Sequence, residues 1–228
     1  MCGRFTLTTN LRAIAKRFGV ARFLEEVGPR YNIAPMQTVI VVNDEGTRHL
    51  TQMRWGLIPS WAKDPTIGNR MINARAETAA TKPAFRVALR KRRCLVVADG
   101  FYEWQQRGRT KQPFRIVLKN GEPFGFAGLW ETWTSPEGEQ MRTCTIITTE
   151  ANDLLKPIHD RMPVILTREA EGLWLDPKIQ DPAILLPLLT PFPTEEMEAY
   201  PVSNRVNNPA HDGPECIVPG RWDTRDGS

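Results

Sequence analysis

The sequence predicts an α+β fold, with a curled, mainly antiparallel β-sheet or barrel-like core and helices inserted between the strands. Three observations predict it. Short runs of β-branched and aromatic residues recur along the 228-residue chain, glycine-containing turn signals separate several of them, and no regular strand–helix alternation indicates a parallel sheet. With 41% hydrophobic residues, a chain of this length can bury one large core. We therefore expect a single domain over residues 1–219 and a polar tail over residues 220–228.

The helices are predicted from apolar residues that recur three and four positions apart. The first covers residues 11–18, with Thr9 as a candidate N-cap and Gly19 just after the last turn. Two more are expected over residues 79–90 and 167–175.

The strands are predicted from apolar runs that are bounded by turn residues. The sequence Asn-Asp-Glu-Gly at residues 43–46 joins the first two of them. The pairs Asp99-Gly100 and Asn120-Gly121 are typical of two-residue turns, so each predicts a hairpin. We expect strands over residues 38–42, 49–55, 94–98, 101–104, 114–118, 124–129, 143–148 and 200–206.

Charge and cysteine spacing limit the classes of function. Thirty basic and 26 acidic side chains leave a net charge of +4, which permits a nucleic-acid partner without requiring one. No run of about 18 apolar residues could span a membrane, and Arg4 and Thr6 interrupt any signal-peptide core. No two of the four cysteines are spaced as a zinc or redox pair, and there are only three histidines, so we expect no metal, no cofactor and a cytoplasmic protein.

The second residue is a cysteine, and a small residue there generally permits removal of the initiator methionine. Cys2 would then carry a free α-amine beside its thiol. Because the reference pKa of an α-amine lies near 8 and that of lysine near 10.4, roughly 250- to 500-fold more of this amine is nucleophilic at neutral pH. The amine can form an imine with an aldehyde, and the thiolate can close on the imine carbon to give a thiazolidine.

Two other interpretations of Cys2 stay open on its position alone. Met1 could be retained, with Cys2 an ordinary strand residue. Alternatively, the chain could be an N-terminal-nucleophile amidohydrolase, in which the thiol attacks an amide and the amine acts as the base.

Six segments together carry a resemblance to a known family. They are Met1-Cys2-Gly3-Arg4-Phe5, Tyr31 to Pro35, Arg54 to Trp61, Asn73 to Thr78, Ala98 to Trp104 and Ile158 to Pro163. In this order they closely resemble the SRAP family, the SOS response-associated peptidases that are also called abasic site processing proteins. The resemblance extends over residues 1–219.

The resemblance implies a single SRAP domain that captures abasic sites in single-stranded DNA through a thiazolidine with Cys2, and so protects the lesion during the response to DNA damage. It also implies a peptidase activity, at least in releasing the chain's own Met1, and a lyase-like activity. The implied partner is single-stranded DNA with abasic sites. We expect a monomer in the cytoplasm, associated with the nucleoid when it acts on DNA.

Four residues are candidates for catalysis, beginning with Cys2. His159 looks like the family histidine, and its reference pKa of about 6.5 suits proton transfer while the abasic sugar opens; a surface histidine in a loop is the plain alternative. Glu103 lies among aromatic residues, where burial would raise its pKa and let it shuttle protons, unless the strand exposes it. Asn73 would orient the sugar or the Cys2 amine by hydrogen bonds.

Five residues are candidate DNA contacts: Arg4, Asn32, Trp61, Arg75 and Arg161. The arginines lie near catalytic candidates and would hold the phosphates that flank the lesion. Trp61 could stack on an unpaired base, or cap an interface instead. Asn32 would shape the pocket or touch the DNA backbone.

Three further features have plain structural explanations. Glu77 is expected to pair with a neighbouring arginine. Phe85 could be a wedge beside the DNA, although its helical spacing from Leu89 is more typical of a core residue. The run Arg-Lys-Arg-Arg at residues 90–93 falls at a predicted helix C-terminus, where cations interact favourably with the helix dipole, with phosphate contact as the alternative.

Two other functions stay open. A cysteine peptidase or amidohydrolase that does not act on DNA would use the Cys2 thiol with His159 as its base. Such an enzyme has no need of the arginines and Trp61, and its binding would not weaken with salt as phosphate contacts do. A single-strand DNA-binding module with an inert Cys2 would retain Met1, which an intact-mass measurement detects.

Overall fold

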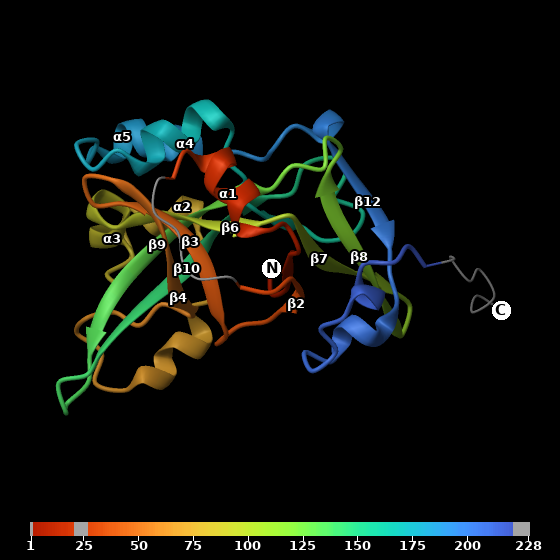
Figure 1. Ribbon diagram of the computed structural model, residues 1–228, viewed down its shortest axis with the longest axis horizontal. Helices are drawn as coiled ribbons and strands as arrows, with labels where there is room; N and C mark the ends of the chain where they lie inside the picture. The colour runs from red at the N-terminus through yellow and green to blue at the C-terminus, as the bar shows by residue number, and fades with distance from the viewer. Residues whose placement is uncertain (1, 21–26, 221–228) are drawn as a thin grey trace.

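Two β-sheets organise residues 2–20 and 27–220, the part of the chain that the computed structural model describes (Figure 1). The strands are β1 (Phe5–Leu7), β2 (Arg30–Ile33), β3 (Thr38–Asp44), β4 (Arg48–Trp55), β5 (Asn73–Arg75), β6 (Arg93–Ala98), β7 (Gly100–Arg107), β8 (Thr110–Leu118), β9 (Phe124–Thr134), β10 (Gln140–Glu150), β11 (Arg161–Pro163) and β12 (Met197–Pro201). One sheet has the order β12-β8-β7-β1-β2. In the other, β9 pairs with both β6 and β10, so that β10, β4, β3, β6 and β9 close into a ring.

Short helices cover the ends and edges of these sheets. They are α1 (Leu11–Phe18), α2 (Ala76–Ala79), α3 (Arg86–Lys91), α4 (Arg168–Leu175) and α5 (Pro182–Leu185), with 3-10 helices η1 (Pro65–Arg70), η2 (Leu186–Leu188), η3 (Thr194–Glu196), η4 (Asn204–Asn207) and η5 (Pro214–Cys216). Figure 1 shows α4 and α5 side by side at the top of the molecule. None of the helices in the described ranges is long and apolar enough to cross a membrane.

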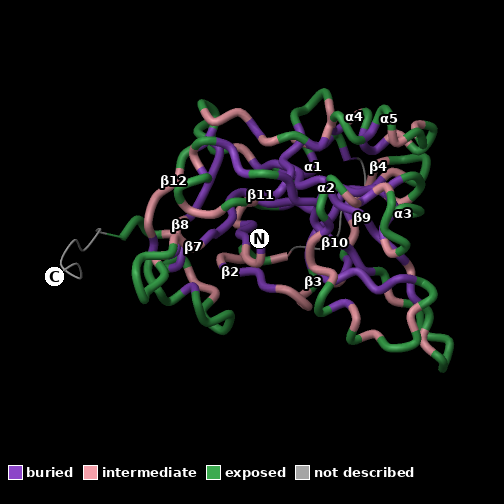
Figure 2. The backbone as a smooth tube through the Cα atoms, turned by 180° about the vertical axis from the view of Figure 1, so that it is seen from behind, coloured by how far each residue is buried: buried purple, intermediate pink, exposed green. Residues whose placement is uncertain are grey.

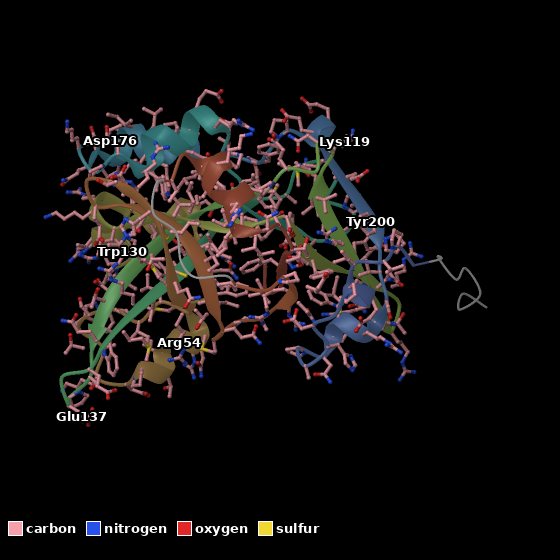
Figure 3. The ribbon with its side chains drawn as sticks, in the orientation of Figure 1. Arg54, Lys119, Trp130, Glu137, Asp176 and Tyr200 are labelled. Carbon is pink, nitrogen blue, oxygen red and sulfur yellow. The ribbon has the colours of Figure 1, made fainter. Side chains whose placement is uncertain are left out.

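The core lies between the two sheets, and β1 is part of it. The Phe5 ring lies 5.2 Å from the Trp55 ring and 5.8 Å from the Phe126 ring, centroid to centroid. Phe101 and Phe124 extend this cluster with edge contacts to Phe126. Figure 2 shows the buried backbone running through both sheets, and in Figure 3 Tyr200 and Lys119 mark one side of the molecule while Arg54 and Trp130 mark the other. The N-terminal strand is therefore held inside the fold by aromatic packing.

The predicted fold class is confirmed. The structure is α+β with mainly antiparallel pairing, apart from the parallel pairs that β10 makes with β4 and β5. β3 and β4 form a hairpin as predicted, but Asn43 and Asp44 still pair with His49 and Arg48, so the turn lies at residues 45–47. The helix predicted over 167–175 is α4, and Thr167 caps it by accepting a hydrogen bond from the Ala170 amide.

Two predicted hairpins are wrong. The chain passes from β6 to β7 at Asp99-Gly100 and from β8 to β9 through Asn120-Gly121, but in each case the two strands belong to different sheets. Gly121 does adopt the left-handed conformation that such turns use, with φ of 68°. The local turn chemistry is therefore present, and packing of the sheets decides which strands pair.

Three element boundaries also differ from the prediction. The helix expected over 79–90 is broken into α2 and α3, because Pro83 interrupts the turn between them. The N-cap of α1 is Asn10, whose side chain accepts from the Ala13 amide, and not Thr9. The strand expected over 200–206 is β12, which ends at Pro201. Of the predicted tail, all but Gly220 lies outside the described residues.

Candidate functional site

Cys2 lies inside the molecule, and Gly3 and Arg4 connect it to β1. Cys2 exposes none of its surface, and its carbonyl oxygen accepts a hydrogen bond of 2.7 Å from the Asn73 side chain. Burial raises the pKa of the Cys2 thiol well above its usual range, and the nearby charge of Glu103 raises it further. In this state the thiol keeps its proton, so its use as a nucleophile requires a group that removes the proton.

Glu103 lies on β7, and only 2% of its surface is exposed. Burial raises the pKa of Glu103, and a protonated His159 opposes that rise. Cys2 and His159 therefore both lie within electrostatic reach of one buried carboxyl group. The predicted burial of Glu103 is confirmed, and the alternative of an exposed strand glutamate is excluded.

His159 follows the turn that ends β10. Its Nδ1 atom accepts a hydrogen bond of 3.0 Å from the Arg161 amide, and its own amide donates to the Leu155 carbonyl. In a neutral imidazole this arrangement leaves the proton on Nε2. The exposed Asp160 carboxylate lies 2.9 Å from Nδ1. The imidazole is half-buried, and its hydrogen bond with the Arg161 amide fixes its orientation.

Asn73 begins β5, which pairs in parallel with β10 so that Asn73 lies opposite Ile146. The amide nitrogen of its side chain is used by Cys2, as described above. Its Oδ1 atom is buried and has no hydrogen-bond partner within residues 2–20 and 27–220. An unpaired buried acceptor is costly, so this oxygen is available to a donor that a bound molecule brings.

The three candidate arginines lie in different surroundings. Arg4 donates to the Asn32 side chain and to the Val206 carbonyl, and its guanidinium lies 5.9 Å from the centre of the Trp104 ring. Arg75 is exposed at the end of β5. Arg161 pairs with Glu77 on α2, as predicted for Glu77, with N–O distances of 2.6 and 3.0 Å.

The first 209 residues match the family model described as SOS response associated peptidase (SRAP). The chain belongs to the SRAP family. It is 52% identical over 221 residues to the abasic site processing protein YoqW of Bacillus subtilis, covering 95% of this chain and 99% of that protein. The abasic site processing protein YoaM of the same organism is 49% identical, with 95% and 97% covered. A crystal structure of a protein from Bacteroides thetaiotaomicron superposes with a TM-score of 0.87 at 30% identity, over 96% of this chain and all of that one.

In this SRAP chain, Asn32 lies beneath Arg4 and is fully buried. Its Nδ2 atom donates to the carbonyl groups of Val206, Asn208 and His211, at 3.3, 3.2 and 2.6 Å. Direct contact between Asn32 and DNA would require this loop to open. The position of Asn32 instead suits a residue that holds Arg4.

The loop over residues 206–212 is the part of the site that sequence analysis missed. Besides its contacts with Asn32, it carries Asp212, whose carboxylate accepts hydrogen bonds from the Tyr31 and Asn32 amides at 2.6 and 2.7 Å. Asn207 accepts a hydrogen bond of 2.7 Å from the Trp104 indole. The Asn, Pro and Asp residues there indicate only a loop, because the residues that this loop contacts lie far away in the sequence.

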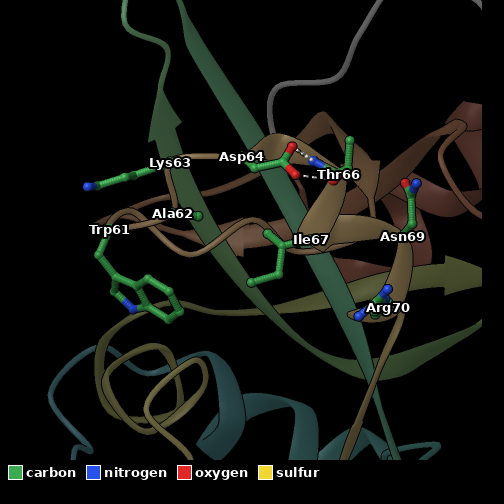
Figure 4. Close-up of a pocket in the computed structure, with 8 residues that line it drawn as sticks. All are labelled: Trp61, Ala62, Lys63, Asp64, Thr66, Ile67, Asn69 and Arg70. Atoms are coloured by element: carbon green, nitrogen blue, oxygen red, sulfur yellow. Dashed lines mark hydrogen bonds between the residues drawn. The ribbon is translucent and has the colours of Figure 1, made fainter.

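Trp61 borders a surface pocket of about 440 Å³ (Figure 4). Its side chain is 60% exposed, which excludes the alternative of an interface cap within the described chain. The loop that carries it is anchored from β9, where the Trp133 indole donates to the Ala62 carbonyl at 2.7 Å. Figure 4 shows the Trp61 ring at one end of the pocket and Asn69 and Arg70 at the other. The pocket is lined by Trp61, Ala62, Lys63, Asp64, Thr66, Ile67, Asn69 and Arg70.

The basic run at residues 90–93 is largely structural. Arg93 is buried and donates to the Leu89 and Arg90 carbonyls at the end of α3, as well as to the carbonyls of Trp174 and Asp176. Burial lowers its pKa to about 10. Arg92 pairs with Glu131 at 2.6 Å. These two side chains satisfy carbonyl groups and a carboxylate, which supports the helix-end explanation.

Phe85 is 5% exposed and packs in the main core, which is the plain explanation of its helical spacing. In the part of the chain that the structure covers, no group of three or more His, Cys, Asp or Glu side chains is placed to hold a metal ion.

Proposed function

We propose that this protein captures abasic sites in single-stranded DNA as a thiazolidine on Cys2, after removal of Met1. The observation that supports the proposal is that Cys2 and Glu103 are both buried and the charge of Glu103 acts on the Cys2 thiol. The charge of His159 acts on the same carboxyl group, and the Asn73 side chain donates to the Cys2 carbonyl. The relatives YoqW and YoaM, which are half identical over nearly the whole chain, are abasic site processing proteins by name.

The chemistry proceeds in two bond-forming steps with the loss of one water. The open form of an abasic deoxyribose offers an aldehyde, to which the neutral Cys2 amine adds to give a carbinolamine. Loss of water gives an imine, and addition of the thiol sulfur to the imine carbon, with transfer of its proton to nitrogen, closes the five-membered ring. Because burial raises the pKa of the thiol, the sulfur step follows the amine step and needs a proton acceptor.

Glu103 suits both proton transfers. Its raised pKa keeps it protonated to higher pH than an ordinary glutamate, so it can donate to the departing hydroxyl of the carbinolamine. The carboxylate that remains can then accept the thiol proton of Cys2. His159 would transfer a proton to and from the sugar oxygen while the hemiacetal opens, and the free Oδ1 of Asn73 would accept a hydrogen bond from the sugar or the Cys2 amine.

Contacts to the DNA backbone would come from Arg4, Arg75 and Arg161, with Trp61 as a stacking platform for an unpaired base. Asn32 would act by holding Arg4. An exposed tryptophan on an anchored loop loses little freedom when a base stacks on it. We propose that the protein acts as a monomer in the cytoplasm, and light scattering of the purified protein checks the monomer.

Intact-mass spectrometry tests the covalent step. The purified protein should lack Met1, and after exposure to single-stranded DNA whose uracil has been excised it should gain the mass of the DNA less one water, in a heat-stable adduct. Cys2→Ala should form only an imine, which borohydride traps and heat reverses. A heat-stable adduct of Cys2→Ala in equal yield, or active protein that retains Met1, would overturn the proposal.

A peptidase activity that releases Met1 is a second proposal, favoured by the peptidase description of the family model. The same thiol would attack the Met1 carbonyl, with His159 or Glu103 as the proton acceptor, and the Met1–Cys2 amide bond would break to leave a thioester and a free Cys2 amine. Water would then hydrolyse the thioester, which releases methionine and restores the thiol. Protein synthesised in vitro without methionine aminopeptidase tests it, because its mass should fall by one methionine with time. If Cys2→Ala loses Met1 equally fast, the release belongs to another enzyme.

A further inference from the structure

The guanidinium group of Arg161 is already occupied by a carboxylate. Arg161 Nη1 lies 2.6 Å from Glu77 Oε1, and Nη2 lies 3.0 Å from Glu77 Oε2. Nη2 also donates to the Thr148 carbonyl on β10 at 2.7 Å. The side chain of Arg161 is 15% exposed and that of Glu77 is 53% exposed. The pair is therefore open to solvent on the glutamate side and fixed to the sheet on the arginine side.

A bidentate carboxylate and a phosphate use the same two N–H groups of an arginine. The Arg161 backbone amide is committed to His159, and the guanidinium is held against the strand by Thr148. Arg161 therefore has little freedom to turn toward a phosphate while it keeps Glu77. A phosphate that binds this edge has to displace the Glu77 carboxylate, which lies on the short helix α2 and can turn into solvent.

We propose that Glu77 competes with DNA for Arg161, and so weakens the reversible binding of undamaged single strands. Glu77 is thus a specificity-determining residue. The inference rests on the proposed function, in which Arg161 contacts a phosphate beside the lesion. The ligand class that Glu77 opposes is the phosphodiester backbone, which every single strand carries whether or not it has lost a base.

Competition of this kind suits a protein that forms a covalent bond with its target. Undamaged strands, which greatly outnumber lesions, leave faster because each has to exclude Glu77 from Arg161. An abasic strand meets the same opposition, but formation of the thiazolidine removes it from the binding equilibrium. Weaker reversible binding therefore shortens the time that the protein spends on undamaged strands, while the final yield of adduct with abasic strands stays the same.

The test is the affinity of Glu77→Gln for an undamaged, fluorescently labelled single strand, measured by anisotropy over a series of salt concentrations. Glu122→Gln is the matched control, since Glu122 also pairs with an arginine, Arg168, at 2.6 Å on an exposed surface. Both variants remove one negative charge. We expect Glu77→Gln to bind about three- to tenfold more tightly than the unmodified chain and Glu122→Gln to change by less than about twofold.

Competition also predicts a double-mutant result. In an Arg161→Ala background, Glu77→Gln should leave the affinity unchanged within about twofold, because the group for which DNA and Glu77 compete is gone. Capture of an abasic strand by Glu77→Gln should be inhibited at a correspondingly lower concentration of undamaged competitor DNA. Thermal melting of each variant shows that the fold is retained.

The possible failures are distinguishable. If Glu77→Gln binds undamaged DNA as the unmodified chain does, or more weakly, then Glu77 does not compete with phosphate and the inference is overturned. If Arg161→Ala binds undamaged DNA as tightly as the unmodified chain, the phosphate contact of the proposed function is wrong. Neither result bears on the formation of the Cys2 adduct, which intact mass reports separately.

Discussion

Replacement of Asp99 by Asn should destabilise the protein strongly, because this carboxylate ties the chain after β1 to the rest of the fold. Asp99 Oδ2 accepts hydrogen bonds from the Thr8 and Thr9 amides at 2.5 and 2.9 Å and from their hydroxyls at 2.8 and 3.0 Å. Oδ1 accepts from the Thr6 hydroxyl at 2.6 Å and lies 3.4 Å from Arg115. An asparagine keeps only one of the two oxygens. Its NH₂ group would therefore face either the Thr8 and Thr9 amides or the Thr6 hydroxyl and Arg115, all of which donate to Asp99.

The magnitude follows from the two backbone amides. Their hydroxyl neighbours can rotate toward water, but the Thr8 and Thr9 N–H groups would lose a charged acceptor. Hydrogen bonds to charged groups contribute about 1.5–3 kcal/mol each, so the loss of two should lower the free energy of unfolding of Asp99→Asn by about 3–6 kcal/mol. In a chain of this size each kcal/mol corresponds to about 2–4 °C, so the melting temperature should fall by about 10 °C. Asp153→Asn, which changes an exposed carboxylate that pairs with Lys156, is the control and should change the melting temperature little.

The pH dependence gives a second check on Asp99. Burial alone would raise its pKa, but the hydrogen bonds from Thr6, Thr8 and Thr9 outweigh burial and hold the pKa of the carboxyl below its ordinary value. A lowered pKa stabilises the folded state above the ordinary pKa of about 3.9, and this contribution is lost as the pH falls below it. The difference between the two proteins should therefore shrink below about pH 4. An Asp99→Asn protein that melts within about 2 °C of the unmodified chain at neutral pH would refute this reasoning.

Three further predictions concern single substitutions. Gly56→Ala should lower the free energy of unfolding by about 2–4 kcal/mol in a denaturant titration, since Gly56 has a φ of 131° and an added Cβ would meet Met36 and lie 2.8 Å from the Gly68 carbonyl oxygen; unchanged stability would show that the loop shifts easily. Trp61→Ala should weaken binding of single-stranded DNA by about 5- to 150-fold in an anisotropy titration without changing the melting temperature, because the ring is 60% exposed. Glu103→Gln should slow formation of the adduct. Its free energy of unfolding should also rise relative to that of the unmodified chain as the pH increases above 4.5, the ordinary pKa of glutamate. The reason is that a buried carboxyl with a raised pKa destabilises the folded state once the same group has ionised in the unfolded chain. Parallel stability curves of the two proteins between pH 4 and 7 would contradict the last of these.

The elements that the sequence predicted well are those that local patterns determine. The helix over residues 11–18 and the hairpin of β3 and β4 depend on spacing and on turn residues that lie next to them. The failures have a common cause, which is that contacts between distant segments override the local pattern. Asp99-Gly100 has the composition of a hairpin turn, but the Asp99 carboxylate accepts hydrogen bonds from Thr6, Thr8 and Thr9, some 90 positions away. Pro83 is the exception, since its break of the predicted helix over 79–90 could have been anticipated.

The candidate site shows the same limit. Cys2 was identifiable from its chemistry at the second position, but the grouping of Asn73, Glu103 and His159 around it came from the family resemblance. Neither source indicated the loop over residues 206–212. Its contacts are hydrogen bonds between side chains and carbonyl groups of distant segments, which leave no periodic pattern in the sequence.

The pairing of β10 has a consequence for the geometry of this site. Asn73 and Arg75 lie opposite Ile146 and Thr148 on one edge of β10, while Arg161 lies opposite Glu150 through the antiparallel pairing with β11. The positions of Asn73, Arg75 and Arg161 relative to one another are therefore set by the residues of β10 with which they pair. The spacing of these three residues is fixed by the backbone pairing of β10 with β5 and β11, and it does not depend on the conformation of the connecting segments.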